Sequence, residues 1–225
     1  MTWWKLNPIL FEQFKEELSG FNDLKFNIID EEVIVEGYWT VHGQDKPIMR
    51  YKIKIIIPSD YPQTIPKIFE IDNLIPKKIE RHFNPADNSA CLFVKPERWK
   101  HWPLGSGIDV FLNGPVKDFF FSQTYYDLTG IWPFGEYNHG DLGIIEYFLK
   151  FLNLTNVLSL YEFFPYIDLM KPEKRLLCPC RSGIRFRQCH WERFKFLKDR
   201  LPRNEWDELL LIINSQLKEL VRLYY

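Results

Sequence analysis

Apolar residues in the first third of the chain follow two different periods. From Pro8 to Ser19 they recur at helical spacing among Glu and Lys, and Gly20 follows, which predicts an amphipathic helix that ends at the glycine. From Lys25 to Ile71, four stretches rich in Ile, Val, Tyr and Phe are separated by short polar or proline-containing links. Short links favour hairpins, so this region predicts an antiparallel meander of four strands.

The pattern changes again after the meander. Periodicity is weak from Ile71 to Gly105, where aromatic, proline and polar residues predominate, and a loop of this length is usually functional. The helical period returns at Ile108 and is interrupted at Pro115, which predicts two helices or one kinked helix, with the proline in a first turn. A further helix is predicted from Leu142 to Leu152.

The last segment carries the strongest helix pattern. Asn204 is a suitable N-cap, acidic residues follow it, and one apolar stripe then runs along the helix. The stripe consists of Trp206, Leu209, Leu210, Ile213, Leu217, Leu220 and Val221. A change of composition near residue 153 predicts a main domain over residues 1–152 and a helical extension over residues 153–225.

Composition narrows the class of protein. The 225 residues are 46% hydrophobic and 26% charged, which suits a domain with an appendage and excludes a disordered chain. No apolar run reaches the roughly 18–20 residues of a membrane span, and no secretion signal is evident, so we expect a cytoplasmic protein. The net charge of −1 hides an asymmetry, because residues 171–200 hold ten Lys or Arg and three acids, giving +7 there and −8 elsewhere.

The four cysteines fall into two groups. Cys178, Cys180 and Cys189 lie within twelve positions, whereas Cys91 lies alone in the long loop, a distribution that does not suit a disulfide framework. His190 adjoins Cys189, so two thiolates from a tight turn and two following ligands can surround one ion tetrahedrally, as structural zinc requires. Disulfides and thiols without metal are the alternatives.

The stretch from Cys178 to His190 resembles the SEC-C zinc motif, including its serine–glycine pair at Ser182 and Gly183. The resemblance implies a zinc knuckle at about residues 174–192. Its ligands would be Cys178, Cys180, Cys189 and His190. Four protein ligands leave no position for a substrate, so the zinc would be structural. The basic residues around the motif fit nucleic acid, an acidic protein surface or an ordinary solvated face.

Several landmarks in and before the long loop resemble the ubiquitin-conjugating enzymes. Tyr61 begins a tyrosine–proline link after the third predicted strand, and His82 and Asn84 follow with one residue between them. Cys91 comes seven positions after Asn84, and Trp99 eight positions after Cys91. In order, these residues resemble the family's tyrosine–proline link, its histidine–proline–asparagine motif, its catalytic cysteine and the tryptophan that follows it.

The resemblance covers roughly residues 8–125 and implies an α+β fold: an N-terminal helix, a four-stranded antiparallel meander, an active-site loop and helices. It implies an enzyme that conjugates proteins through a thioester. Cys91 would accept the C-terminus of a ubiquitin-like protein from an activating enzyme and pass it to an acceptor protein, because a thiolate is both a strong nucleophile and a good leaving group. Asn84 would support the loop and donate to the tetrahedral oxyanion. His82 would hold the loop by hydrogen bonds.

The chain also departs from the family. Phe83 and Ile65 stand where prolines are usual, and Asp60 and Asp87 are the candidates for the acid that helps to deprotonate the acceptor. Residues 112–123 and 131–140 resemble divergent bacterial members that accompany cGAS-like nucleotidyltransferases in CBASS anti-phage operons. The resemblance therefore implies a role in anti-phage defence, with the nucleotidyltransferase C-terminus or another ubiquitin-like tail as the modifier.

Two rival hypotheses belong to other functional classes. A catalytically silent scaffold of the same fold would dock partners through the zinc knuckle, since one fold can serve several functions. A nucleic-acid adaptor built on the basic knuckle is the weaker alternative, and its affinity would fall steeply with salt.

Overall fold

The computed structural model describes residues 2–168 and 175–224. They form two compact units, of which the first comprises the chain up to Phe93 together with Lys100–Glu136. The second comprises Val94–Trp99 and the chain from Tyr137 onwards. The units thus divide between Glu136 and Tyr137, earlier than the predicted domain boundary after residue 152.

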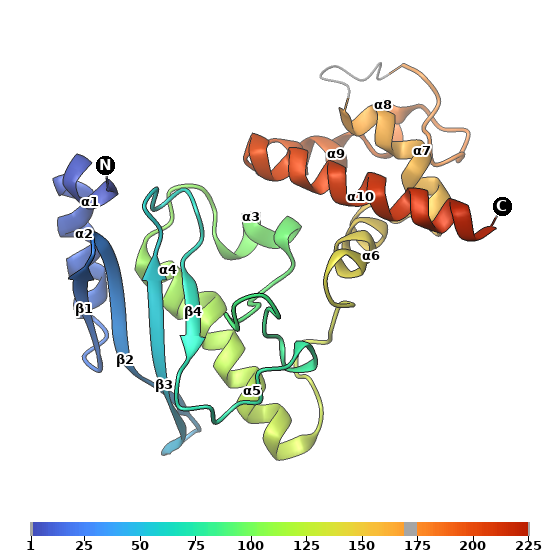
Figure 1. The fold of residues 1–225 in the computed structure, drawn as a ribbon. Helices are drawn as coiled ribbons and strands as arrows, with labels where there is room; N and C mark the ends of the chain where they lie inside the picture. The colour runs from blue at the N-terminus through green and yellow to red at the C-terminus, as the bar shows by residue number, and fades with distance from the viewer. Residues whose placement is uncertain (1, 169–174, 225) are drawn as a thin grey trace. The chain divides into compact units, whose positions relative to one another are not determined.

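The first unit contains a four-stranded antiparallel sheet (Figure 1). Its strands are β1 (Leu24–Ile29), β2 (Glu32–His42), β3 (Pro47–Ile57) and β4 (Lys67–Glu70), paired in the order of the sequence. The predicted meander is therefore confirmed. From Tyr51 to Ile57 of β3, alternate residues lie in the core and the side chains between them are half-buried.

Helices of the first unit precede and follow the sheet. They are α1 (Trp3–Leu6), α2 (Pro8–Ser19), α4 (Ile108–Phe111) and α5 (Lys117–Thr129). The predicted helix from Pro8 to Ser19 is confirmed, and its first turn is capped by the side chain of Asn7, which accepts a hydrogen bond from Leu10 N at 3.1 Å. Phe14 of α2 and Phe120 of α5 are fully buried in one core with the sheet.

The interruption predicted at Pro115 is a π-helical segment, η3 (Leu112–Val116), which joins α4 to α5 without a break. Pro115 lies inside this segment, not in the first turn of a second helix. Proline has no N–H to donate and crowds the preceding turn, and the wider π turn accommodates both effects.

The second unit is helical. Its elements are η2 (Lys95–Glu97), α6 (Asp141–Leu152), α7 (Val157–Asp168), α8 (Phe186–Cys189), α9 (Trp191–Lys198) and α10 (Arg203–Tyr224). The predicted helix from Leu142 to Leu152 is confirmed, with α6 beginning one residue earlier, and α10 begins one residue before the predicted cap Asn204. A short helix, α3 (Arg98–His101), lies where the chain returns to the first unit.

The apolar stripe predicted for α10 is described in part. Leu209, Leu210 and Ile213 are buried, which agrees with the prediction. The side chains of the other stripe members lie outside the described set. Residues 171–174 of the basic segment, the last of which begins the predicted knuckle, also lie outside the described residues. None of the helices described combines the length and the apolarity that a membrane crossing requires.

Candidate functional site

Glu70, the last residue of β4, organises the start of the long loop. Its buried carboxylate pairs with Lys77 and accepts hydrogen bonds from the backbone N–H groups of Asp72, Leu74 and Ile75. A buried carboxylate requires such partners, so this residue fixes the direction of the chain after the sheet. From Ile71 to Gly105, every residue is described, and the loop contains only the short helical turns η1 (Ile79–Arg81), η2 and α3.

The chain then folds back as a short hairpin beside β4. Phe83 and Ala90 form an antiparallel bridge, and Cys91 N donates to His82 O at 2.8 Å. Ala90 N also donates to Ile68 O of β4 at 2.8 Å, which ties the hairpin to the edge of the sheet. The backbone of the predicted nucleophile is therefore hydrogen-bonded to His82, and the backbone of the residue before it is hydrogen-bonded to β4.

The thiol of Cys91 is exposed, whereas Phe83 is buried. Phe83 faces Ala90 across the bridge, and successive residues of an extended strand alternate between faces. Asn84 follows Phe83 and Cys91 follows Ala90, so the pairing puts Asn84 and Cys91 on the same face of the hairpin, diagonally across from each other. The bridge thus places these two predicted site residues on one face of the hairpin.

A chain of hydrogen bonds positions the amide of Asn84. Its Nδ2 donates to Ser89 Oγ at 2.8 Å, and Ser89 Oγ donates to Asp87 Oδ1 at 2.7 Å. Lys67 Nζ lies 2.7 Å from Asp87 Oδ2. The hydrogen bonds from Lys67 and Ser89 lower the pKa of Asp87 to about 2, so this carboxylate stays ionised and closes the turn of the hairpin.

His82 joins the hairpin to α5 through aromatic contacts. Its backbone has a left-handed φ of 55°, and its ring meets the edge of Trp132 with centroids 4.6 Å apart. Trp132 in turn stacks on Tyr126 of α5 at 4.4 Å. The described contacts of the His82 ring are with the ring of Trp132 and the carboxylate of Glu136. The predicted role of His82 in holding the loop by side-chain hydrogen bonds therefore stays a prediction.

Sequence reasoning missed two polar features near His82. Arg81 Nε donates to Gln123 Oε1 at 2.9 Å, and Gln123 Nε2 donates back to Arg81 O at 2.9 Å, so a fully buried amide fixes the backbone before the hairpin. Glu136 Oε1 lies 3.5 Å from His82 Nε2. Of the two acids proposed from the sequence, Asp87 serves the hairpin turn, and Asp60 accepts a hydrogen bond from Thr64 Oγ1 at 2.7 Å.

Trp99, the fourth landmark of the resemblance, belongs to the second unit. Its Nε1 donates to the hydroxyl of Tyr147 at 3.1 Å, and its ring packs edge-on against Phe196 at 4.7 Å. Trp99 is therefore part of the core of the helical unit, a placement that its distance from Cys91 along the sequence did not indicate.

The second unit contains the cluster of Cys178, Cys180, Cys189 and His190. Their ligand atoms all lie within 4.8 Å of one another. His190 Nδ1 is 3.2 Å from the sulfur of Cys178 and 3.0 Å from that of Cys189, and the sulfurs of Cys180 and Cys189 are 3.5 Å apart. The last separation exceeds the roughly 2.05 Å of a disulfide, and none of the four cysteines, all of which are described, forms a disulfide.

These separations fit one tetrahedral ion. A Zn–S bond of about 2.3 Å places two coordinated sulfurs about 3.8 Å apart, close to the distance between Cys180 and Cys189. His190 Nε2 donates to Leu152 O at 2.5 Å, which leaves the lone pair of Nδ1 directed at the sulfurs. Burial lowers the pKa of His190 and keeps the imidazole neutral, the form that binds metal.

Local backbone structure places the ligands. Leu177 and Arg185 form an antiparallel bridge, and Cys178 N donates to Ile184 O at 2.8 Å, which closes a tight knuckle. Arg181 has a φ of 61° and Gly183 a φ of 73°, so the turn between the cysteine pair and Ile184 is left-handed. The next residues form α8, whose end carries the other two ligands.

The basic residues around the knuckle are largely engaged within the unit. Arg181 pairs with Glu162 of α7, Arg193 donates to Phe151 O at 3.0 Å, and Lys195 lies 3.3 Å from Asp199. Phe186 and Phe194 are buried in the core of the same unit. In the part of the chain described, Arg185 and Arg187 are exposed and form no ion pair.

Comparison of the chain with models of protein families, with curated proteins and with solved structures returned no match. The chemistry of the two clusters therefore rests on their own geometry.

Proposed function

We propose that the protein is a thioester-forming acyltransferase with Cys91 as its nucleophile, carried by a ubiquitin-conjugating-enzyme-like domain. The observation that carries the proposal is an exposed cysteine at the end of a hairpin whose backbone is hydrogen-bonded to His82 and, through Ala90, to β4. The order of elements supports it, since N-terminal helices, a four-stranded meander, the site loop and further helices follow one another.

The reaction requires two exchanges at one carbonyl carbon. In the first, the sulfur of Cys91 attacks the thioester that joins the modifier's C-terminus to an activating enzyme; a new S–C bond forms, and the activating enzyme's thiolate leaves with the proton. In the second, an acceptor amine attacks the Cys91 thioester; the C–N bond forms, the S–C bond breaks, and the departing thiolate takes the amine's proton. Exchange between thioesters is nearly isoenergetic, so the first step needs no further energy.

Asn84 is the proposed oxyanion donor. Its Nδ2 has two N–H groups, and Ser89 accepts only one of them, so the other is available for the negatively charged oxygen of either tetrahedral intermediate. The bond to Ser89 holds the amide in one orientation before the substrate arrives. Donors of this kind contribute on the order of 10²–10³ in rate.

We propose that Cys178, Cys180, Cys189 and His190 bind one Zn²⁺ ion. When bound, the ion would cross-link the knuckle to α8 and supply no reactive position, because four protein ligands complete its tetrahedron. The hydrogen bond from His190 to Leu152 O and the burial of Cys178 support a structural site.

The proposed partners follow from the resemblance described above. The modifier would be the C-terminus of a cGAS-like nucleotidyltransferase or of a ubiquitin-like protein, delivered by an activating enzyme and passed to an acceptor protein in anti-phage defence. Cysteine at an exposed position suits this transfer because the carbonyl carbon that its sulfur attacks would lie at the C-terminal end of a large partner.

A silent scaffold is the second candidate, and one observation favours it. Asp87, which lies in the same hairpin as Cys91, is paired with Lys67 and has a pKa of about 2, so it is a poor acceptor for the proton of an amine. A scaffold would need no such acceptor and would use the fold and the knuckle only for docking.

Non-reducing gels distinguish the two candidates. The purified protein is incubated with ATP and the products of genes encoded beside its own; the enzyme hypothesis predicts an adduct that dithiothreitol removes. Cys91→Ala should abolish the adduct, and Cys91→Ser should give an oxyester that resists dithiothreitol but not alkali. An adduct that persists in Cys91→Ala would refute the role of this residue.

A further inference from the structure

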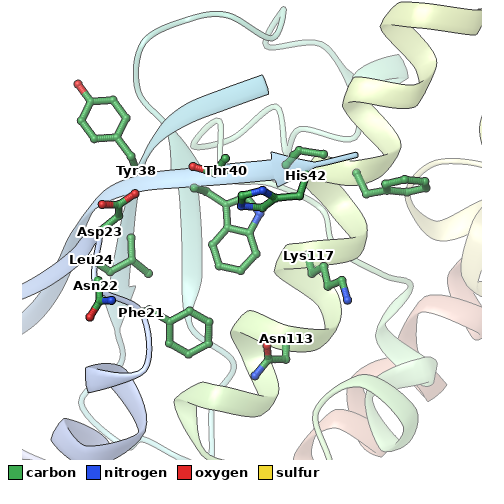
Figure 2. A pocket seen from close by; sticks show the side chains of 12 residues that line it. Phe21, Asn22, Asp23, Leu24, Tyr38, Thr40, His42, Asn113 and Lys117 are labelled. Atoms are coloured by element: carbon green, nitrogen blue, oxygen red, sulfur yellow. The ribbon is translucent and has the colours of Figure 1, made fainter. Parts of the chain in front are cut away.

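A cavity of about 570 Å³ lies in the first unit, and its lining includes no residue of the Cys91 hairpin (Figure 2). Three segments line it: residues 21–24, which form the turn before β1 and its first residue, the second half of β2 from Tyr38 to His42, and the helical residues Asn113, Lys117 and Phe121. Figure 2 shows Phe21 and Asn113 on one side and Thr40 and His42 on the strand opposite them. Its volume falls in the range of about 300–1,000 Å³ that is usual for binding sites.

The cavity runs along an open edge of β2. β1 pairs with β2 only as far as Leu24 and Gly37, and the last hydrogen bond beyond that pair is from Tyr38 N to Asp23 O at 3.1 Å. Backbone groups of alternate residues point to the same side of a strand, so the N–H and C=O of Thr40 face this side as well. In the part of the chain described, they meet no neighbouring strand there.

Gly37 keeps this edge open. Its φ is 153°, and a Cβ atom at this position would lie 1.9 Å from Asp23 O. The segment that joins α2 to β1 therefore passes so close to β2 that only glycine fits at residue 37. The crossing stops β1 from continuing along Thr40.

The charges around the cavity favour an acidic ligand. Asp23 is compensated, because its Oδ2 lies 3.4 Å from a guanidinium nitrogen of Arg50. Lys117 is exposed and forms no ion pair with any described residue. The lining thus has one uncompensated positive charge.

Apolar surface adjoins that charge. Phe21 and Trp39 stack with centroids 6.1 Å apart, and Phe121, one turn after Lys117 on α5, is 38% exposed. An extended peptide places alternate side chains on one face, so a single segment can pair with Thr40 and present both an apolar and an acidic side chain to this lining.

We propose that this cavity binds an extended segment of a partner protein, added as a strand to β2 at Thr40, with a carboxylate side chain at Lys117. The Cys91 hairpin is tied to β4, the strand at the other end of the sheet order from β1. The inference is therefore independent of the proposed acyl transfer, and the two can fail separately.

The test uses the full chain labelled with ¹⁵N and a series of ten-residue peptides. Each peptide alternates Val and Thr, has blocked termini and carries one Glu, placed at a different position in each member. We expect at least one member to bind and to shift the amide resonance of Thr40, with affinity falling at least tenfold when Glu is replaced by Lys or when the amide facing Thr40 is N-methylated.

Charge reversal provides the matched comparison. Lys117→Glu should invert the preference between Glu and Lys peptides, whereas Lys25→Glu, an exposed lysine of β1 outside the cavity, should leave it unchanged. The proposal is overturned if no peptide binds below about 1 mM, if Lys117→Glu has no effect, or if acetate competes as well as the peptide, since a small anion site needs no strand.

Discussion

The amide of Asn84 has two tasks in this account, one toward Ser89 and one toward the oxyanion. The bond to Ser89 fixes its orientation, and the diagonal position across the hairpin puts it on the same face as Cys91. An oxyanion donor and the residue that positions it contribute different amounts to the reaction rate. Separate mutations of Asn84 and Ser89 therefore distinguish the two contributions.

Asn84→Ala should slow the discharge of a Cys91 thioester to a lysine amine by about 10²–10³, because the oxyanion loses its donor. Ser89→Ala should have a smaller effect, since the amide remains but is less well held. Single-turnover discharge assays measure both rates. Equal rates for Asn84→Ala and the wild type would remove Asn84 from the mechanism.

Asp87 makes the hairpin sensitive to acid. Its pKa is lowered from an ordinary 3.8 to about 2, so the folded state binds this proton less tightly than the unfolded state, and the stabilisation is present above about pH 4. It is lost as the pH falls from about 4 to 2. The side chain is partly exposed, so water and salt weaken the effect.

Urea unfolding of the wild type and of Asp87→Asn between pH 6 and 2 measures this contribution. The difference in unfolding free energy should be largest above pH 4 and should shrink toward pH 2. A difference that stays constant across this range would show that the ionisation of Asp87 does not contribute to stability.

Two elements, the knuckle and the edge of β2, each depend on particular residues, for different physical reasons. The knuckle holds four possible ligand atoms within 4.8 Å of one another, from two buried and two half-buried residues, whereas β2 depends on the missing side chain of Gly37. One substitution in each element tests this dependence: Cys180→Ser in the knuckle and Gly37→Ala in β2.

Zinc should copurify at about one ion per chain, and Cys180→Ser should lose it. Because the ion would connect the knuckle to α8, the variant should also unfold at a lower temperature. Cys91→Ser is the matched control and should keep both the metal and the stability. Elemental analysis and thermal unfolding test the prediction, and metal-free wild-type protein prepared without chelators would contradict it.

Gly37→Ala should destabilise the protein by about 1–3 kcal/mol, because its Cβ would overlap a backbone oxygen that cannot move freely. Gly130→Ala serves as a comparison: Gly130 has a φ of 73°, but no atom lies within 4 Å of an added Cβ, so only the backbone strain of about 1 kcal/mol applies. Urea unfolding gives both values. A smaller loss at Gly37 than at Gly130 would contradict the close crossing.

At the scale of the whole molecule, periodic features could be predicted from the sequence and features formed by distant contacts could not. The meander and the helix from Pro8 to Ser19 are periodic, and the Cys/His cluster is local in the sequence, so spacing was sufficient to predict them. The bond between Arg81 and Gln123 joins residues 42 positions apart without a repeating pattern.

The place where the two compact units divide could not be predicted from the sequence pattern either. α6 and Trp99 pack in the second unit because Tyr147 joins them through a hydrogen bond and a shared apolar core. The change of composition near residue 153 lies inside the second unit, which begins at Tyr137. Packing, and not composition, sets where the compact units divide.

The most direct test of the central claim is the mass of the intact protein under non-reducing conditions, after reaction with ATP, an activating enzyme and the modifier. We expect a gain equal to the mass of one modifier less one water, which is lost on treatment with dithiothreitol and is absent in Cys91→Ala. A protein of unchanged mass with every activated modifier tested, or a gain that persists in Cys91→Ala, would contradict it.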